Sequence, residues 1–564
     1  MTDVPAFSQM SAETPTFEHL SAEMARIQQA FERAPSADAR EAAVQEWNRL
    51  RRQTQTWSSL VGLRFNQDTR NPDYKKARDY RDKLGPKLTN LENDFKKKLL
   101  KPHFRTELEQ RYGKQAFALW ECDARSFDPS IEEHQVRISK LGAEYTELLS
   151  DAKFNFRGET LNMPGLGRYF KDDDRATRRE AQGLRWNWFA QNRPRLDSIF
   201  HELVRLRHES ALKLGLKDYV ELGYLRMHRV DYNRNDVEKL RQQVVQQVVP
   251  LCSKLAEQDA RTLGIDKVKF WDDGIHDAMG APRPHGDHDW MNQRAQEMFS
   301  EIGHGLGDFF KLLREKQLLD LKSREGKAGG GFCTSFPTWG VPYVFANFNG
   351  TQGDVEVFTH EMGHAFQSYS SRNQRLTDYL WPTYESAEIH SMSLEFITWP
   401  WMEKFFNEDA DRFRRSHLIG SLFFLPYGCA VDHFQHLVYE NPQASPAERF
   451  EMWKRMEATY LPWRDYDDLP HCSEGGFWQA QRHIYLSPFY YIDYVLAQVC
   501  AMQFWVRADQ DRDAAMRDYV ALCKRGGEAP FQQLAKGANL VSPFEPGCLD
   551  AVVSKARDWL ASRG

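Results

Sequence analysis

The chain has 564 residues, which is too long for one small domain and long enough to bury a large core. Hydrophobic residues make up 41% of it and aromatic residues 13%, which excludes a disordered chain. Its 75 basic and 80 acidic residues give a net charge of −5, so nothing favours a nucleic acid as the main partner. We expect short basic runs such as Arg51-Arg52 and 96–98 to lie on solvated helix faces.

Cysteine usage and hydropathy bear on the compartment. The eight cysteines are scattered and form no C-x-x-C motif, which favours free thiols in a reducing compartment over a disulfide framework. Residues 1–16 lack the apolar core of a signal peptide. The most apolar stretch, 418–431, contains Pro426 and Gly428 and is too short to cross a bilayer. We therefore expect a cytoplasmic protein with no membrane partner.

Helical periodicity extends through most of the sequence. Apolar residues recur every three or four positions along 17–31, 196–206 and 237–248, which is typical of helices packed on a core. Two segments, 154–166 and 326–353, interrupt this pattern with glycines and short apolar or aromatic runs. The first suggests a hairpin or loop, and the second predicts short strands. We expect a mainly α-helical protein, with a helical N-terminal lobe over 1–150 and a larger lobe over 151–564 that holds a small β-sheet.

A metal-binding motif follows directly after the predicted strands. A helix that begins near Thr351 contains His360-Glu361-Met362-Gly363-His364. One helical turn separates the two histidines, so both imidazoles lie on one face and can share a tetrahedral metal ion. Glu361 lies about 100° around the helix, close enough to reach a metal-bound water without binding the metal. The residues after His364 do not continue the metzincin pattern. The motif therefore predicts a metallopeptidase zinc site whose third ligand lies elsewhere.

The third ligand is expected downstream of this motif. The segment 383–395 predicts a second helix, in which Glu388 and Glu395 are two turns apart and share a face. One of them can bind zinc while the other accepts a hydrogen bond from a ligand imidazole. Glu385 and His390 are competing candidates that the spacing leaves open.

The segment 483–494 offers hydrogen-bond donors. Hydrolysis of an amide builds negative charge on the carbonyl oxygen, and donors already aimed at that oxygen stabilise the charge. Tyr491 and Tyr494 lie about one helical turn apart and could point two phenols into a cleft, and His483 could reach the same region from the preceding loop. Tyr490 remains an alternative to either tyrosine.

The motif 360–364, together with the acidic residue in Ala387-Glu388-Ile389, resembles the thimet oligopeptidase and oligoendopeptidase F family of zinc metallopeptidases, in its bacterial Pz-peptidase-like branch. The detailed resemblance covers about residues 320–500. It implies a two-lobed helical shell around a deep substrate channel, with the zinc at the bottom. It also implies Glu388 as the third ligand and Glu395 as its companion. In this family, a histidine and tyrosines of the segment matching 483–494 contact the substrate or the oxyanion.

We therefore expect a zinc endopeptidase that cuts short unstructured peptides, with one zinc ion per chain and active-site segments at about 329–400 and 480–500. Glu361 would take a proton from the zinc-bound water and pass it to the leaving amine. The strand expected at 343–348 is a candidate to bind the substrate backbone as an added strand. The alternatives are a helical zinc carboxypeptidase and an inactive peptide-binding relative. No obligate protein partner is expected.

Overall fold

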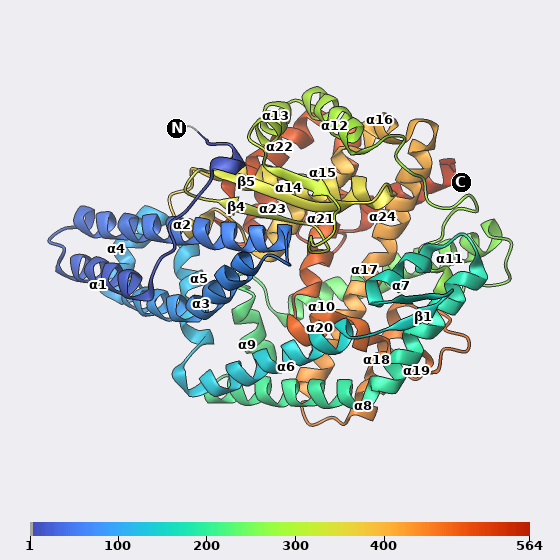
Figure 1. Ribbon diagram of the computed structural model, residues 1–564, viewed down its shortest axis with the longest axis horizontal. Coiled ribbons are helices and arrows are strands. Elements are labelled where there is room, and N and C mark those ends of the chain that lie inside the picture. Colours follow the sequence, from blue (N-terminus) through green and yellow to red (C-terminus); the bar gives the residue numbers. More distant parts are fainter. Residues whose placement is uncertain (1–3, 564) are drawn as a thin grey trace. The chain divides into compact units, whose positions relative to one another are not determined.

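The computed structural model describes residues 4–563, and helices make up most of this chain, as predicted (Figure 1). The chain forms two compact units, each assembled from segments that are distant in sequence. Unit 1 combines Met1–Ala124, Pro282–Ala410 and Cys500–Ser542, and unit 2 combines Arg125–Ala281, Asp411–Val499 and Pro543–Gly564. The expected lobes 1–150 and 151–564, and the channel between them, stay predictions. None of the helices within residues 4–563 is long and apolar enough to cross a membrane.

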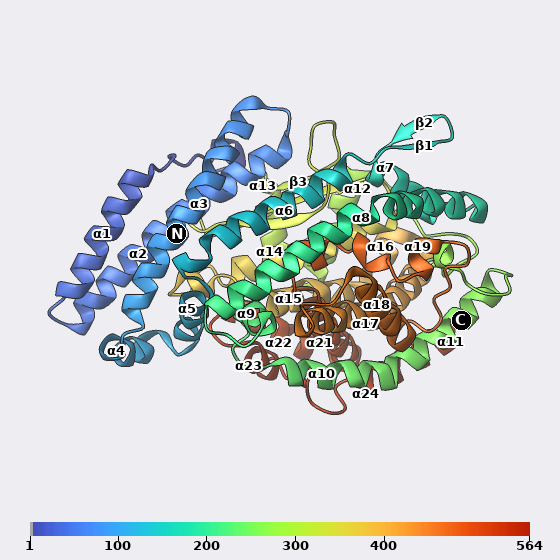
Figure 2. The same ribbon diagram turned by 90° about the horizontal axis from the view of Figure 1, so that it is seen from below.

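A bundle of long helices forms the N-terminal part of unit 1. The side chains of Thr16 and Ser36 cap its first two helices by accepting backbone N–H groups of the first turn. The first three helices lie side by side (Figure 2), and Phe31, Trp47 and Phe95 are buried in their shared core. The helices are α1 (Phe17–Arg33), α2 (Ala37–Gln67), α3 (Pro72–Leu99), α4 (Pro102–Tyr112) and α5 (Gln115–Ser126).

A small sheet in unit 1 confirms the strands predicted within 326–353. Its strands are β3 (Leu319–Lys322), β4 (Phe332–Phe336) and β5 (Val341–Phe348), in the order β3-β5-β4. β5 runs parallel to β3 and antiparallel to β4, and most of β5 is buried, which explains its nearly continuous apolar sequence. Because both edges of β5 are paired, the expectation that 343–348 takes up the substrate backbone is wrong. In the described sheet β3 and β4 are the two edge strands.

Further helices of unit 1 surround this sheet. α14 packs on β4 and β5, and α15 and α22 pack on α14 (Figure 1). These helices are α12 (His288–Ile302), α13 (Leu306–Glu315), α14 (Gln352–Ser370), α15 (Tyr384–Ile397), α16 (Glu403–Phe406), α22 (Arg512–Arg525) and α23 (Phe531–Gly537).

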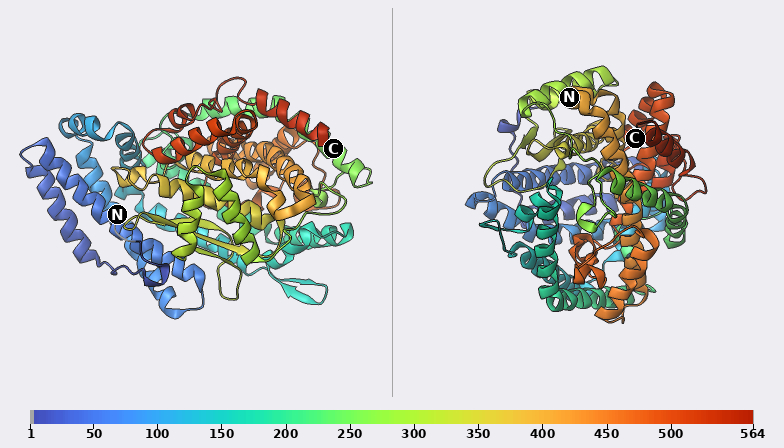
Figure 3. Two further views of the ribbon diagram at one scale, coloured as in Figure 1. Left: turned by 90° about the horizontal axis from the view of Figure 1, so that it is seen from above. Right: turned by 90° about the vertical axis from the view of Figure 1, so that its right-hand side faces the viewer.

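Unit 2 is built on the long helix α8 (Arg175–Lys213), along which α6 (Glu132–Ser150) packs (Figure 2). The hairpin allowed for in 154–166 is present as β1 (Phe154–Phe156) and β2 (Glu159–Leu161), and it stands out from the helices of its unit (Figure 3). Its two-residue turn, Arg157-Gly158, has positive φ at both positions, as a tight hairpin turn requires.

The other helices of unit 2 are α7 (Met163–Gly167), α9 (Tyr219–Arg226), α10 (Arg234–Gln243), α11 (Val249–Thr262), α17 (Ala410–Glu440), α18 (Pro446–Tyr460), α19 (Pro470–Ser473), α20 (Arg482–Leu486) and α24 (Asp550–Arg563). Helix α21 (Tyr491–Gln510) begins in unit 2 and continues into unit 1.

The expectation that the short basic runs lie on solvated helix faces is wrong at two positions. Lys96 is buried, and its Nζ atom is 2.8 Å from Asp123 Oδ2. Arg51 is not on a solvated face: its side chain is 13% exposed and forms an ion pair with Asp378, which is 9% exposed. Two guanidinium nitrogens of Arg51 donate to the two carboxylate oxygens of Asp378, at 2.6 and 3.0 Å. The Trp120 indole donates to the same carboxylate at 3.1 Å. This pair anchors the segment between α14 and α15 to the N-terminal bundle.

Removing one partner of this pair should destabilise unit 1. Asp378→Asn leaves the buried Arg51 with only the more distant carboxylate of Glu92, at 3.7 Å, and we expect a loss of about 3–5 kcal/mol in the free energy of unfolding. Burial alone would raise the pKa of Asp378, but the Arg51 guanidinium holds that pKa well below its usual range. The stabilisation is therefore complete above the unfolded-state pKa of about 4 and lost as the pH falls through the folded-state pKa.

Urea unfolding of parent and Asp378→Asn protein at pH 7, and again in acid, measures this difference. The matched control is Glu325→Gln, which removes the exposed partner of Arg70 in the same unit. That change should cost about 1 kcal/mol or less. Equal effects of the two substitutions at pH 7 would show that burial of the Arg51 pair does not matter.

Candidate metal centre and catalytic groups

Helix α14 presents the His360–His364 motif from a firmly held start. Its N-cap is Thr351, as predicted, but the capping contact comes from Asp354, whose carboxylate accepts backbone N–H groups of Asn349 and Gly350. The helix then lies against β4 and β5 on one side. The strand-to-helix connection therefore sets the direction in which the motif points.

A close contact between α14 and α15 brings the two parts of the site together. Gly363 lies directly against the backbone of α15: a Cβ atom at this position would be 2.4 Å from the His390 carbonyl oxygen and 2.6 Å from Ser391 Cα. Only glycine fits there. The small residue within the motif thus allows the second helix to approach until its carboxylates reach the histidines.

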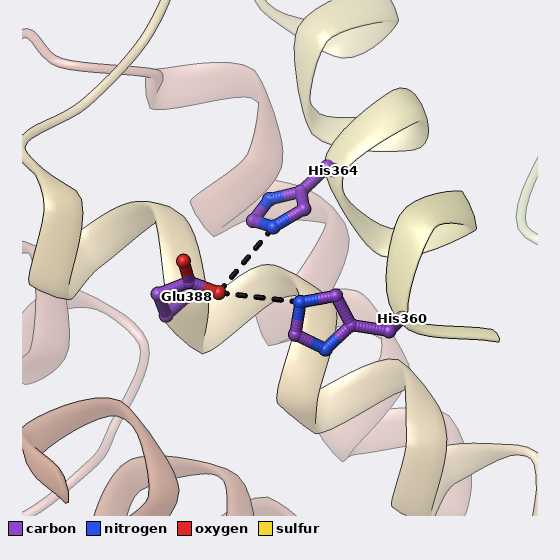
Figure 4. Close-up of side chains that lie close together, drawn as sticks. All are labelled: His360, His364 and Glu388. Atoms are coloured by element: carbon purple, nitrogen blue, oxygen red, sulfur yellow. Dashed lines mark ion pairs between the residues drawn. The ribbon is translucent and has the colours of Figure 1, made fainter. Parts of the chain in front are cut away.

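The side chains of His360, His364 and Glu388 converge at this contact (Figure 4). Glu388 Oε2 is 3.4 Å from His360 Nε2 and 3.3 Å from His364 Nε2. Donors bound to one tetrahedral zinc ion at about 2.0–2.1 Å lie about 3.3 Å apart, so this spacing fits a single ion. Two imidazoles and one carboxylate are also a donor set that zinc prefers. The residues present therefore fit a catalytic zinc site.

Neighbouring side chains orient these donors. His360 Nδ1 is 2.7 Å from Glu395 Oε1, so the carboxylate accepts a hydrogen bond from Nδ1–H. This leaves Nε2 available for a metal. Ser391 Oγ donates to Glu388 Oε2 at 3.0 Å. Glu388 and Glu395 thus lie on one face of α15, as predicted. Glu388 lies where a metal ligand is needed, and Glu395 bonds a histidine of the motif.

The two competing ligand candidates lie elsewhere. Among the described residues, Glu385 and His390 do not join the group of potential ligands. His390 is fully buried, and its ring lies near Tyr519 of α22. Burial lowers the pKa of His390 to about 4, so it is a neutral core residue.

Glu361 is the second acidic group of the motif and is only 7% exposed. Its Oε2 atom has no hydrogen-bond partner among the described residues. Burial raises the pKa of Glu361 above the usual carboxyl range, although His360 and His364 oppose this change. β4 begins beside it, since a Cβ atom at Gly331 would lie 3.6 Å from Glu361 Oε1. A buried carboxylate with a vacant acceptor is suited to take up a proton.

The structure also gathers the predicted donors of unit 2. The ring centroid of His483 is 5.0 Å from that of Tyr491 and 6.1 Å from that of Tyr494, and the two tyrosine rings are 5.7 Å apart. Tyr490 belongs to the same aromatic cluster, 5.8 Å from His483, so the geometry keeps it as an alternative. Burial raises the pKa of Tyr491, which keeps its phenol protonated and able to donate.

A buried ion pair holds the turn that carries these tyrosines. Arg229 donates to the Phe489 carbonyl and, at 2.8 Å, to Asp493 Oδ1, and both charged side chains are fully buried. Phe489 has φ +68°, an unusual value for a residue with a side chain, and its ring lies against Gly223. The start of α21 is thereby held by contacts with residues that are distant in sequence and that the local sequence does not predict.

Comparison with known proteins shows what the whole chain is similar to. The Peptidase M3 N-terminal domain matches residues 7–127, and Peptidase family M3 matches 168–275 and 294–553. A solved structure of Pz peptidase A with an inhibitor is 43% identical, with a TM-score of 0.93 and 99% coverage of both chains. A protein described as oligoendopeptidase F is 46% identical (TM-score 0.92, 99% of both chains). Another so described, from Bacillus anthracis str. Ames, is 40% identical (TM-score 0.88, 99% of this chain and 98% of that one). Among curated proteins, none matches the chain.

The contact at Gly363 leads to a testable expectation. Gly363→Ala forces α14 and α15 apart, because the new methyl group would overlap backbone atoms that cannot rotate away. We expect a loss of about 1–3 kcal/mol in unfolding free energy and a lower metal content after incubation with zinc. Gly183→Ala in α8 is the control, since no atom lies within 4 Å of a Cβ atom there. It should leave the metal content unchanged. Full metal content in Gly363→Ala would contradict this account of the site.

Proposed function

Because this chain belongs to peptidase family M3, we propose that His360, His364 and Glu388 hold one zinc ion per chain with which the protein cuts internal bonds of short, unstructured peptides. That it is a metallo-oligopeptidase follows from the family and from its similarity to oligoendopeptidase F and Pz peptidase structures. The observation that carries the zinc assignment is the position of Glu388 Oε2, 3.4 Å from His360 Nε2 and 3.3 Å from His364 Nε2. A cytoplasmic location, which the scattered cysteines favour, belongs to the same proposal.

A zinc ion at this site supplies a Lewis acid that polarises the scissile carbonyl and makes water more acidic. Glu361 is the general base: it takes a proton from the attacking water on its vacant Oε2 and delivers it to the leaving amine. Its raised pKa suits both halves of this transfer. Glu395 holds the His360 ring in the tautomer that presents Nε2 to the metal.

We propose that the substrate backbone pairs with β4. This strand is at the edge of the described sheet, its side chains from Phe332 to Ser335 are only partly buried, and it begins beside Glu361. An extended peptide added there would be held through its main chain, which tolerates many sequences. We thus propose for β4 the binding of the substrate backbone that the sequence suggested for β5.

His483, Tyr491 and Tyr494 are proposed to donate hydrogen bonds to the substrate carbonyl oxygen as it becomes negative. Their clustering in unit 2 supports this role, because the three rings, from α20 and α21, lie with centroids 5.0–6.1 Å apart.

The roles of the three acidic residues are separable. Glu361→Gln removes the proton acceptor and keeps every ligand, so we expect one zinc ion per chain and a fall in kcat of about 10²–10⁴-fold. Glu388→Ala removes a ligand, so zinc content and turnover should fall together. The control is Glu385→Gln, one turn earlier on α15, which should keep its zinc. Metal analysis and peptide-cleavage kinetics on the three variants measure these outcomes, and near-parental turnover by Glu361→Gln would disprove the mechanism.

The tyrosines are tested by removing their hydroxyl groups. Tyr494→Phe and Tyr491→Phe keep the rings, so loss of an oxyanion donor should lower kcat by about 10²–10³-fold with little change in KM. Tyr460→Phe is the control, because it breaks a tyrosine–histidine hydrogen bond elsewhere in unit 2, with His433. If all three variants keep the parental kcat and differ only in melting temperature, the tyrosines are packing residues.

A further inference from the structure

His483 is bonded through one ring nitrogen to a side chain that the mechanism does not use. Gln481 Nε2 lies 2.8 Å from His483 Nδ1, and the Tyr427 hydroxyl donates to Gln481 Oε1 at 2.6 Å. The three side chains form a continuous hydrogen-bonded row within unit 2. They come from α17, from the residue before α20, and from α20 itself.

We infer that Tyr427 and Gln481 are positioning residues that hold His483 as a neutral imidazole with its proton on Nε2. The importance of this arrangement rests on the function proposed above for His483. With the proton on Nε2, the ring can donate a hydrogen bond from Nε2 to the substrate oxygen. With the proton on Nδ1, Nε2 could only accept a hydrogen bond.

The direction of each bond follows from the orientation of the Gln481 amide. Its Oε1 atom faces the Tyr427 hydroxyl, and because an amide oxygen can only accept, the phenol donates to it. The NH₂ group then faces the imidazole, and a nitrogen that accepts this N–H must carry a lone pair. His483 Nδ1 is therefore unprotonated, and the single proton of the neutral ring lies on Nε2.

The two positioning residues are themselves held rigidly. The Tyr427 ring packs edge-on against Phe477 and against Tyr491, with centroid distances of 6.1 and 5.8 Å. The backbone of Gln481 is bound on both sides: its N–H donates to the Trp478 carbonyl at 2.9 Å, and its carbonyl accepts from Ile484 at 3.1 Å. Because Tyr427 and Gln481 are held in place, their hydrogen bonds can fix the orientation of the His483 ring.

The surroundings keep the groups in the required protonation states. Burial raises the pKa of Tyr427, so its hydroxyl keeps the proton that it donates. Burial, aided by the charge of Arg482, lowers the pKa of His483. A doubly protonated ring would turn an N–H of the imidazole against the N–H of Gln481. Geometry and environment therefore favour the same singly protonated ring.

The first test reads the tautomer directly, in protein that keeps Tyr427, Gln481 and His483. Long-range ¹H–¹⁵N correlation spectra of zinc-loaded protein labelled with [¹⁵N]histidine distinguish a protonated from an unprotonated ring nitrogen. The His483 signals are those absent from His483→Ala. A protonated Nε2 and a bare Nδ1 are expected at neutral pH. A proton on Nδ1 overturns the inference, whatever the activity of the protein.

The second test reverses the tautomer. Gln481→Glu has nearly the same shape, but its carboxylate can only accept, so the proton should move to Nδ1 of His483 and kcat should fall by about 10²-fold with little change in KM. Gln191→Glu, which adds the same charge at an exposed position of α8, should be neutral. A parental tautomer in Gln481→Glu would contradict the inference.

A double variant separates positioning from a general structural role. If Gln481 acts through His483, adding Gln481→Glu to His483→Ala should cost no further activity. Equal losses in both backgrounds would show that Gln481 merely supports the fold. Tyr427→Phe should lower kcat about 10-fold and mix the tautomers, whereas Tyr460→Phe should not. If His483→Ala keeps the parental kcat, the proposed role of His483 fails, while the spectra still decide the tautomer.

Discussion

The distance between α14 and α15 is the constraint on which the metal centre depends. Because Gly363 has no side chain, the backbone of α15 reaches the motif, and Glu388 comes to lie between the two imidazoles. The same approach lets Glu395 bond the far side of His360. α22 supports this arrangement from behind, where the Tyr519 hydroxyl donates to the His390 carbonyl at 2.9 Å. One missing side chain thus allows two helices to supply the proposed ligands, the base and the supporting carboxylate.

Buried carboxylates in this protein serve two opposite purposes. Asp378 and Asp493 each bond a buried arginine, and such pairs join segments that are distant in sequence. Glu361 is buried beside the histidines with a vacant oxygen, and burial raises its pKa, whereas Arg51 lowers that of Asp378. A buried carboxylate paired with an arginine is stabilised in its charged form, whereas a buried carboxylate without such a partner is ready to exchange a proton.

Unit 2 contributes groups whose usefulness depends on where their protons are. A phenol donates reliably while its pKa stays high, but an imidazole can donate or accept through the same nitrogen. The row from Tyr427 through Gln481 resolves this ambiguity for His483. Since Tyr427 also packs on Tyr491, one residue of α17 bears on two of the proposed donors.

The sequence by itself determined the helical character, the strands near 326–353 and the metal-binding motif, because all three depend on spacings within a few residues. Four features were decided only by the tertiary structure. Glu388, rather than Glu385 or His390, meets the imidazoles because of the way α15 packs against α14 at Gly363. The order β3-β5-β4 puts β5 in the centre and leaves β4 at an edge, and strand order is a relation between segments. Arg51 is buried because Asp378, 327 residues further along, packs against it. Gln481 gave no signal, because a glutamine in a loop becomes informative only when Tyr427 and His483 are seen on either side of it.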